Sequence, residues 1–313
     1  PPLLPLRLSI AMNKYLITVI GPTAIGKTAL AVSLARQFET EIISSDSRQF
    51  YKEMSIGTAA PTVKEQQGIP HHFIQHISIS SSYSVGDFEA EALQKIEVLF
   101  RKHNILILVG GSGLYTDAVL YGLDTFPAIS PGIREGLNQT LETKGIAALQ
   151  AQLQELDPEY YRKVDINNPH RLIRALEVCL SSGKPYSSFL GQPKADRPFI
   201  PIILGLKAER DTLYERINTR VDQMMANGLL EEVKQLLPYK ELNALQTVGY
   251  QELFAFLEGK YKLETAVEEI KKNTRRFAKR QLTWYRKAND VMWFDYRTPH
   301  NEIASILEEK LIS

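Results

Sequence analysis

Cysteine is almost absent from this 313-residue chain, in which Cys179 is the only one. A single thiol excludes an intrachain disulfide and a zinc site built on several cysteines, and it is typical of a reducing compartment, so we expect a cytoplasmic protein. No run of about 18 apolar residues is present, so no transmembrane helix is predicted. Charge of one sign is not in excess either, because 37 Lys and Arg stand against 36 Asp and Glu. The composition therefore excludes disulfide-stapled and membrane-spanning proteins and gives no global sign of nucleic-acid binding.

The first eleven residues, PPLLPLRLSIA, are rich in proline and contain no methionine. They are too short and too often interrupted by proline for a secretory signal. We predict that residues 1–12 are disordered or foreign to the native protein, with Met12 as the start, and that the fold begins at about Asn13.

Apolar runs alternate with helical patterns in the first part of the chain. YLITVI at 15–20 and EIISS at 41–45 have the character of strands, and 87–102 has that of a helix that Asp87 caps. ILILV at 105–109 is apolar at every position, as in a parallel strand covered on both faces. This alternation predicts an α/β fold with a doubly wound parallel sheet, like that of P-loop NTPases.

Beyond about Leu123 the pattern becomes helical, interrupted by prolines and without a strong strand, until IPIILGL at 200–206. We predict an all-helical insertion at 123–198 inside a core formed by 13–122 and 199–313.

GPTAIGKT matches the phosphate-binding pattern G-x-x-x-x-G-K-[ST] and stands between a predicted strand and a predicted helix. The backbone N–H groups of such a loop converge on phosphate oxygens, and the helix N-terminus adds partial positive charge. Lys27 is expected to reach the outer phosphate, and the Thr28 hydroxyl is expected to bind Mg²⁺. The predicted diphosphate-binding residues are Gly21, Pro22, Thr23, Ala24, Ile25, Gly26, Lys27 and Thr28.

Proteins that hydrolyse nucleotides with this loop usually end a later strand in aspartate, which helps to hold Mg²⁺. Here ILILV is followed by GGSG at 110–113, with no acid. An NTPase is therefore disfavoured, and a small-molecule kinase or a transferase that uses the loop for pyrophosphate stays open. Asp46 follows the strand at 41–45, at an end that faces the ligand crevice of such sheets, although a turn or capping role is an equal alternative. The second Gly-rich turn is expected to bring Ser112 to the same crevice.

Positive charge is concentrated near the C-terminal end, where KKNTRRFAKRQLTWYRK at 271–287 holds eight Lys or Arg and no acid. A helical wheel places a basic face opposite Phe277, Gln281 and Trp284, which we expect to be buried. Such concentration favours contact with a phosphate backbone over a merely solvated face. The face comprises Lys272, Arg275, Arg276, Lys279, Arg280, Arg286 and Lys287. For His71 and His72 we expect structural or substrate-side roles and not metal binding, and for Cys179 a place in the core.

Eight motifs in order carry a resemblance that covers residues 14–290. They are GPTAIGKT, DSRQFY (46–51), IGTAAP (56–61), HH (71–72), GGSGLY (110–115), NPHRLIRALEV (168–178), TVGYQE (247–252) and KRQLTW (279–284). The chain thus resembles the tRNA dimethylallyltransferases, also called tRNA isopentenyltransferases. The resemblance implies transfer of a dimethylallyl group from its diphosphate to N6 of the adenine 3′ of the anticodon, in tRNAs that read codons starting with U. It implies Mg²⁺, dimethylallyl diphosphate and the tRNA anticodon stem-loop as ligands of a protein that we expect to be a monomer.

By position, the resemblance places Thr23 to Thr28 on the diphosphate, Arg220 near it, Asp46 at the reacting amine and Ser112 at the reacting centre. Gln246 and Gln251 stand where some relatives carry basic residues, which weakens their assignment to tRNA. Together with the basic segment, the residues assigned to tRNA are Asp46, Ser47, Arg48, Gln49, Ser112, Arg134, His170, Arg171, Leu172, Ile173, Arg174, Gln246, Thr247, Val248, Gly249, Tyr250, Gln251, Arg275, Arg276, Lys279 and Arg280.

The chemistry agrees with these residue types. An adenine amine is a poor nucleophile, and a carboxylate such as Asp46 can take its proton. Lys27, Arg220 and Mg²⁺ can stabilise the departing diphosphate, and the base must be flipped out to react. An adenylate isopentenyltransferase would need neither the insertion nor the basic helix. A small-molecule kinase would transfer phosphate from ATP, and an RNA-binding regulator would not need Lys27, Thr28 and Asp46.

Overall fold

The structure, a computed structural model, describes residues 13–288 and 290–312. The prediction for residues 1–12 lies outside the described residues. The chain forms two compact units, one built from the chain up to Tyr121 together with the chain from Asp196, and the other from Gly122–Ala195. The predicted insertion, 123–198, starts one residue later and ends three residues later than the observed unit.

The core unit is built around a sheet of six parallel strands in the order β3-β2-β4-β1-β5-β6. Val109 in β4 pairs with Val19 on one side and with Ser44 on the other, so the loops that follow β1, β2 and β4 begin side by side. The predicted α/β class is confirmed, and β3 and β6 are strands that the sequence pattern did not indicate. The strands are β1 (Tyr15–Ile20), β2 (Ile42–Ser44), β3 (His71–His72), β4 (Ile105–Val109), β5 (Ile200–Lys207) and β6 (Val291–Asp295).

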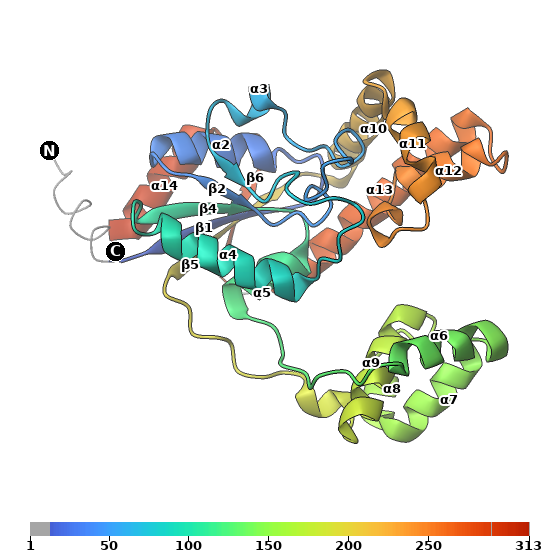
Figure 1. The fold of residues 1–313 in the computed structure, drawn as a ribbon. Helices are drawn as coiled ribbons and strands as arrows, with labels where there is room; N and C mark the ends of the chain where they lie inside the picture. The colour runs from blue at the N-terminus through green and yellow to red at the C-terminus, as the bar shows by residue number, and fades with distance from the viewer. Residues whose placement is uncertain (1–12, 289, 313) are drawn as a thin grey trace, which may run out of the picture. The chain divides into compact units, whose positions relative to one another are not determined.

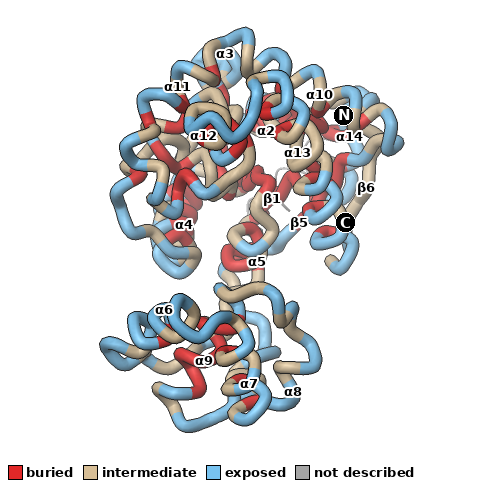
Figure 2. The backbone as a smooth tube through the Cα atoms, turned by 90° about the vertical axis from the view of Figure 1, so that its right-hand side faces the viewer, coloured by how far each residue is buried: buried red, intermediate tan, exposed pale blue. Residues whose placement is uncertain are grey.

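Helices cover both faces of this sheet, which confirms the doubly wound arrangement (Figure 1). Side chains alternate along β1, so Ile17 and Val19 belong to one apolar cluster and Leu16 and Ile20 to another. The first cluster includes residues of α2 (Lys27–Gln37), α10 (Arg210–Ala226) and α14 (His300–Ile312). The second includes residues of α4 (Val85–Leu99) and α5 (Gly113–Tyr121). Figure 2 shows β1 as buried, whereas β6 is half-buried.

The start of α4 differs from the prediction. Ser84, not Asp87, is the N-cap, and its hydroxyl accepts a hydrogen bond from the Asp87 N–H at 3.2 Å. The Asp87 carboxylate accepts in return from the Ser84 N–H at 2.8 Å. Asp87 is thus the third residue of a capping box, one that combines serine with an acid three positions later.

A third apolar cluster joins α10 to α11 (Leu229–Leu236), α12 (Tyr250–Leu257) and α13 (Leu263–Tyr285) and to the loop segment that contains Tyr51 and Ile79. Short elements complete the core unit: α3 (Val63–Gln66) and the 3-10 turns Leu237–Tyr239 and Asn243–Leu245. Among the described residues, no helix combines the length and apolar character needed to cross a membrane.

The insertion unit, whose residues are all described, consists of helices and loops, as predicted. Its own apolar core includes Leu149, Leu153, Leu172 and Leu176. Cys179 is buried in α9, in agreement with the prediction. The helices are α6 (Ile133–Lys144), α7 (Ile146–Leu156), α8 (Pro158–Tyr161), α9 (Pro169–Ser182) and the 3-10 turn Tyr186–Phe189.

Candidate active site

The loop between β1 and α2 has the form of a phosphate cradle. Gly21 adopts φ 148°, and a Cβ on it would lie 2.8 Å from the Leu206 carbonyl oxygen, so a side chain is excluded there. The ammonium of Lys27 donates to the Pro22 carbonyl at 2.9 Å and thus lies across its own loop. Burial lowers the pKa of Lys27 to about 8, against the attraction of Asp46. A buried ammonium of this kind gains strongly from a bound anion.

Helix α10 brings two arginines to the same loop. Arg220 Nη1 lies 3.4 Å from Thr23 Oγ1, and burial lowers the pKa of Arg220 without removing its charge. Arg216 Nε donates to the Ala24 carbonyl at 2.9 Å. The structure therefore places Arg220 where the sequence predicted, and it adds Arg216, which holds the backbone of the loop.

Asp46 lies at the carboxyl end of β2 and lines the same cavity as the cradle. Its Oδ1 accepts a hydrogen bond from the Arg48 N–H at 3.1 Å, which is the bond of an aspartate in a turn. Its Oδ2 faces Gly111, on which a Cβ would lie 3.2 Å away. The two interpretations of Asp46 are thus compatible, because one oxygen belongs to the turn while the residue borders the cavity.

Ser112 connects the second Gly-rich turn to the segment after β2. Its Oγ accepts from the Ser47 N–H at 3.0 Å and lies 2.9 Å from Ser47 Oγ. Arg48 Nη1 donates to the Ala244 carbonyl at 3.2 Å, and Gln49 Nε2 donates to the Thr58 and Ala59 carbonyls. All four side chains border the cavity, and all are already held by neighbouring loops.

The last turns of α13 differ from the helical-wheel prediction. Gln281 is buried as expected, but Trp284 is 40% exposed and Phe277 is half-buried, and both line the cavity. Trp284 Nε1 donates to Asp117 Oδ2 at 2.8 Å, which fixes the indole ring. The buried residues in these turns are Ala278, Gln281 and Tyr285, of which the helical wheel selects only Gln281.

The basic face of α13 is only partly free. Lys272 pairs with Glu269 at 2.5 Å, and Arg275 Nη1 donates to Asn218 Oδ1 at 2.7 Å. Five basic side chains are exposed, and Arg280 among them lines the cavity. The exposed residues are Arg276, Lys279, Arg280, Arg286 and Lys287.

Three residues assigned to tRNA by resemblance are core residues. Leu172 and Ile173 lie in the apolar core of the insertion unit, and Tyr250 is fully buried in the core unit. Their side chains pack in these cores and do not face solvent, and their assignment to tRNA stays a prediction. Five neighbours of Tyr250 line the cavity, and their assignment to tRNA stays a prediction: Gln246, Thr247, Val248, Gly249 and Gln251.

Glu232 is a positioning group that the sequence analysis missed. Its carboxylate accepts hydrogen bonds from the N–H groups of Ser55, Ile56 and Gly57 at 3.1, 2.8 and 3.0 Å. The Tyr250 hydroxyl donates to the same carboxylate at 2.6 Å. Glu232 thus links the cavity-lining IGTAAP loop to α11 and α12. The only sequence signal for this link was that Tyr250 lies in a motif.

Within the insertion unit, two arginines predicted to meet tRNA lie beside one buried acid, Glu177. Arg134 makes a two-pronged ion pair with Glu177, whose side chain is 2% exposed, and Arg174 Nη1 lies 3.7 Å from the same carboxylate. The Arg174 guanidinium also lies 5.1 Å from the centre of the Phe126 ring. His170 and Arg171 are exposed in the first turn of α9.

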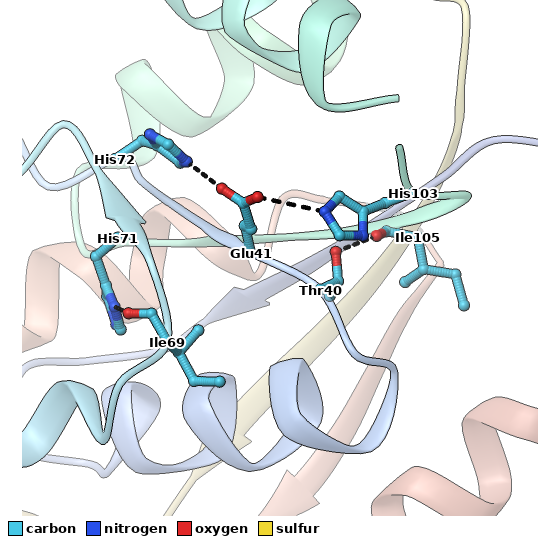
Figure 3. Close-up of polar contacts among 7 residues, drawn as sticks. All are labelled: Thr40, Glu41, Ile69, His71, His72, His103 and Ile105. Carbon is cyan, nitrogen blue, oxygen red and sulfur yellow. Dashed lines mark hydrogen bonds and ion pairs between the residues drawn. The ribbon is translucent and has the colours of Figure 1, made fainter. Parts of the chain in front are cut away.

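Both histidines lie on β3, and His72 belongs to a polar cluster with Glu41, just before β2, and His103, just before β4 (Figure 3). His72 Nε2 lies 2.7 Å from Glu41 Oε2, and His103 Nε2 lies 3.3 Å from Glu41 Oε1. Burial raises the pKa of Glu41, but the hydrogen bonds from both histidines outweigh it and lower the pKa overall. His71 bonds the Ile69 carbonyl at 2.8 Å. Among the described residues no group of three His, Cys, Asp or Glu is arranged to hold a metal ion. His71 also lines the cavity, so both the structural and the substrate-side role expected for the pair stay open.

In the core unit, the loops and helices around the phosphate cradle line a cavity of about 1010 Å³. Its wall contains the cradle, Asp46, the second Gly-rich turn, α10 and α13. This volume suits a ligand pocket for a group larger than a single phosphate ester. The cavity therefore combines an anion site, a carboxylate and aromatic surface in one place.

Known proteins are similar to this chain over most of its length. The family model for IPP transferase matches residues 49–288. The tRNA dimethylallyltransferase of Christiangramia forsetii is 59% identical over 96% of this chain and 99% of its own, and that of Flavobacterium johnsoniae is 56% identical over 96% and 99%.

Solved structures of proteins with the same family name are also similar to this chain. The tRNA isopentenylpyrophosphate transferase of Bacillus halodurans has 37% identity and a TM-score of 0.72, covering 96% of this chain and 97% of its own. A eukaryotic dimethylallyltransferase described as acting on tRNA has 30% identity and a TM-score of 0.76, covering 91% and 75%. The chain therefore belongs to the family of tRNA dimethylallyltransferases.

Proposed function

We propose that this protein transfers a dimethylallyl group from dimethylallyl diphosphate to N6 of the adenine 3′-adjacent to the anticodon, in tRNAs that read codons starting with U. The observation that carries the proposal is that the phosphate cradle and Asp46 border one cavity, which α13 lines with Phe277, Arg280 and Trp284. Family membership supports the same reaction, since the named relatives are tRNA dimethylallyltransferases.

The cradle would hold the diphosphate of the donor. Lys27, Arg220 and the backbone N–H groups at the start of α2 would oppose the charge that grows on the leaving diphosphate. The Thr28 hydroxyl borders the cavity and, with diphosphate oxygens and water, fits the all-oxygen ligand set of Mg²⁺. When bound, the ion would supply further positive charge to the leaving group. No acid follows β4, which suits a cradle that releases diphosphate and does not hydrolyse a nucleotide.

The acceptor adenine would be flipped out of the anticodon loop into the cavity. Its N6 attacks C1 of the dimethylallyl group, the C1–O bond breaks, and the bonding electron pair leaves with the diphosphate. Asp46 takes the proton that N6 loses, which balances the charge at the nitrogen. Its Oδ2 is the oxygen for this role, because Oδ1 belongs to the turn with Arg48.

The anticodon stem-loop would meet exposed positive side chains on both units. Arg276, Lys279 and Arg280 supply them on α13, and Arg134 and Arg171 supply them on the insertion unit. Contacts of this kind bind the RNA backbone and give affinity that falls with salt. The protein would act as a monomer in the cytoplasm, where its tRNA substrate is.

The test is mass spectrometry of tRNA nucleosides after incubation with dimethylallyl diphosphate and Mg²⁺. We expect a gain of one five-carbon prenyl unit on adenosine. Prenylation of free AMP in preference to tRNA would indicate an adenylate isopentenyltransferase instead. Transfer of phosphate from ATP to an acceptor, with no prenylation, would indicate a kinase.

A further inference from the structure

The last turns of α13 are packed directly on the second Gly-rich turn. Gln281 Nε2 donates to the Gly111 carbonyl at 2.8 Å, and the Tyr285 hydroxyl donates to the Gly110 carbonyl at 3.3 Å. The Trp284 ring covers Gly113, on which a Cβ would lie 2.3 Å from the indole. The absence of side chains at Gly111 and Gly113 lets the helix approach the backbone of the turn.

Gln281 also reaches the phosphate cradle. Its Oε1 accepts from the Thr23 N–H at 2.8 Å, so a single side-chain amide, 6% exposed, joins the two Gly-rich loops. The orientation of the amide follows from its partners, because an N–H group can only donate and a carbonyl can only accept. A carboxylate or an aliphatic side chain at this position would lose one bond or both.

Under the proposed function, each of the two Gly-rich loops lies beside a different reacting group. The cradle binds the leaving diphosphate, and Gly111 lies against Oδ2 of Asp46, the proton acceptor. A misplacement of about 1 Å between reacting groups can cost about 10²-fold in rate. We propose that Gln281 is a positioning residue that sets the spacing between the diphosphate and Asp46. It acts through the backbone of the two loops, and this role rests on the proposed function.

Two variants separate the length of the side chain from its hydrogen bonds. Gln281→Met keeps the length and removes both bonds, whereas Gln281→Asn keeps the amide but is one methylene too short to reach both loops. Gln37→Met is the matched control, because the exposed Gln37 bonds Glu308 away from the cavity. Single-turnover prenylation is measured with both substrates saturating, beside the dissociation constants for tRNA and for dimethylallyl diphosphate and the melting temperature.

We expect both Gln281 variants to slow the chemical step by about 10- to 100-fold, with dissociation constants within threefold of the wild type. Hydrogen exchange at the Thr23 amide should become faster in Gln281→Met, since that variant removes its acceptor. The control should match the wild type in every measurement.

Three other outcomes would decide against the role or the reaction. A wild-type rate for folded Gln281 variants would overturn the positioning role, and so would a lower melting temperature with an unchanged rate, which indicates a purely structural bond. If Gln281→Met does not fold, the shorter and less disruptive Gln281→Asn decides by the same criteria. If the wild-type protein itself transfers no prenyl group, the proposed function fails, which differs from failure of the Gln281 role alone.

Discussion

Arginine is used differently in the two units. In the core unit, Arg216 and Arg220 are directed at the backbone or hydroxyl groups of the phosphate cradle, and Arg220 is largely buried. In the insertion unit, Arg134 is 58% exposed although it pairs with the buried Glu177. A charge that must stabilise one leaving group is most effective where water is excluded and its position is fixed. A charge that meets an RNA backbone must reach solvent, where the phosphates are.

The largest expected effect concerns the chemical centre of the core unit. Asp46→Asn retains the shape and the turn acceptor but removes the proton acceptor, so the rate of the chemical step should fall by about 10²–10⁴. Single-turnover prenylation with both substrates saturating measures it. A capping aspartate would tolerate asparagine at little cost, so a rate within threefold of wild type would reject Asp46 as the base.

Lys27→Ala should have the next largest effect, because the ammonium serves both the bound diphosphate and the leaving group. We expect donor affinity and turnover to fall together, with turnover down by about 10²–10³, the usual loss for one donor at a developing charge. Lys234→Ala, which removes an exposed ion-paired lysine of α11, is the control. ATP hydrolysis by the wild-type protein at a rate comparable to prenylation would contradict this use of the cradle.

The residues of the chemical centre could be predicted from the sequence more completely than the residues that hold its loops in place. A phosphate cradle is fixed by local backbone rules, so GPTAIGKT could be placed between a strand and a helix without knowledge of the rest. Glu232 and Gln281 act over long range, on loops that are 175 and 258 residues away in the chain. No local pattern encodes such partners.

Weakly patterned elements were missed for a related reason. β3 has two residues, and β6, VMWFD, is only half-buried, so neither gives the apolar run of a central strand. Trp284 was misplaced because a helical wheel assumes that bulky apolar residues face the core. Here that side of α13 borders a cavity, and Trp284 forms part of its wall.

The lowered pKa of Lys27 predicts a pH dependence of donor binding. Above about pH 8 the lysine of the free protein loses its proton, while a bound anion raises its pKa and restores it. Donor affinity should therefore fall with rising pH above 8, by up to about tenfold per pH unit, and binding should take up a proton. Titration calorimetry in buffers of different ionisation enthalpy measures this uptake, which Lys27→Ala should abolish.

The exposed face of α13 should show the smallest effect, and one confined to binding. Arg276→Ala with Lys279→Ala should reduce the slope of log tRNA affinity against log salt by about 0.9 for each lost phosphate contact. The control replaces Arg101 and Lys102, two exposed charges that precede the amino end of β4. If the slope stays unchanged, this face of α13 is merely solvated.

The central claim is that buried groups carry out the chemical step and exposed groups bind the RNA. It is tested by titrating tRNA under single-turnover conditions with two variants, Asp46→Asn and the double variant Arg276→Ala with Lys279→Ala. We expect Asp46→Asn to lower the maximal rate with little change in the tRNA concentration at half-maximal rate. The double variant should raise that concentration and leave the maximal rate near wild type. A fall in maximal rate for both variants, or a shift in tRNA affinity for both, would contradict the account.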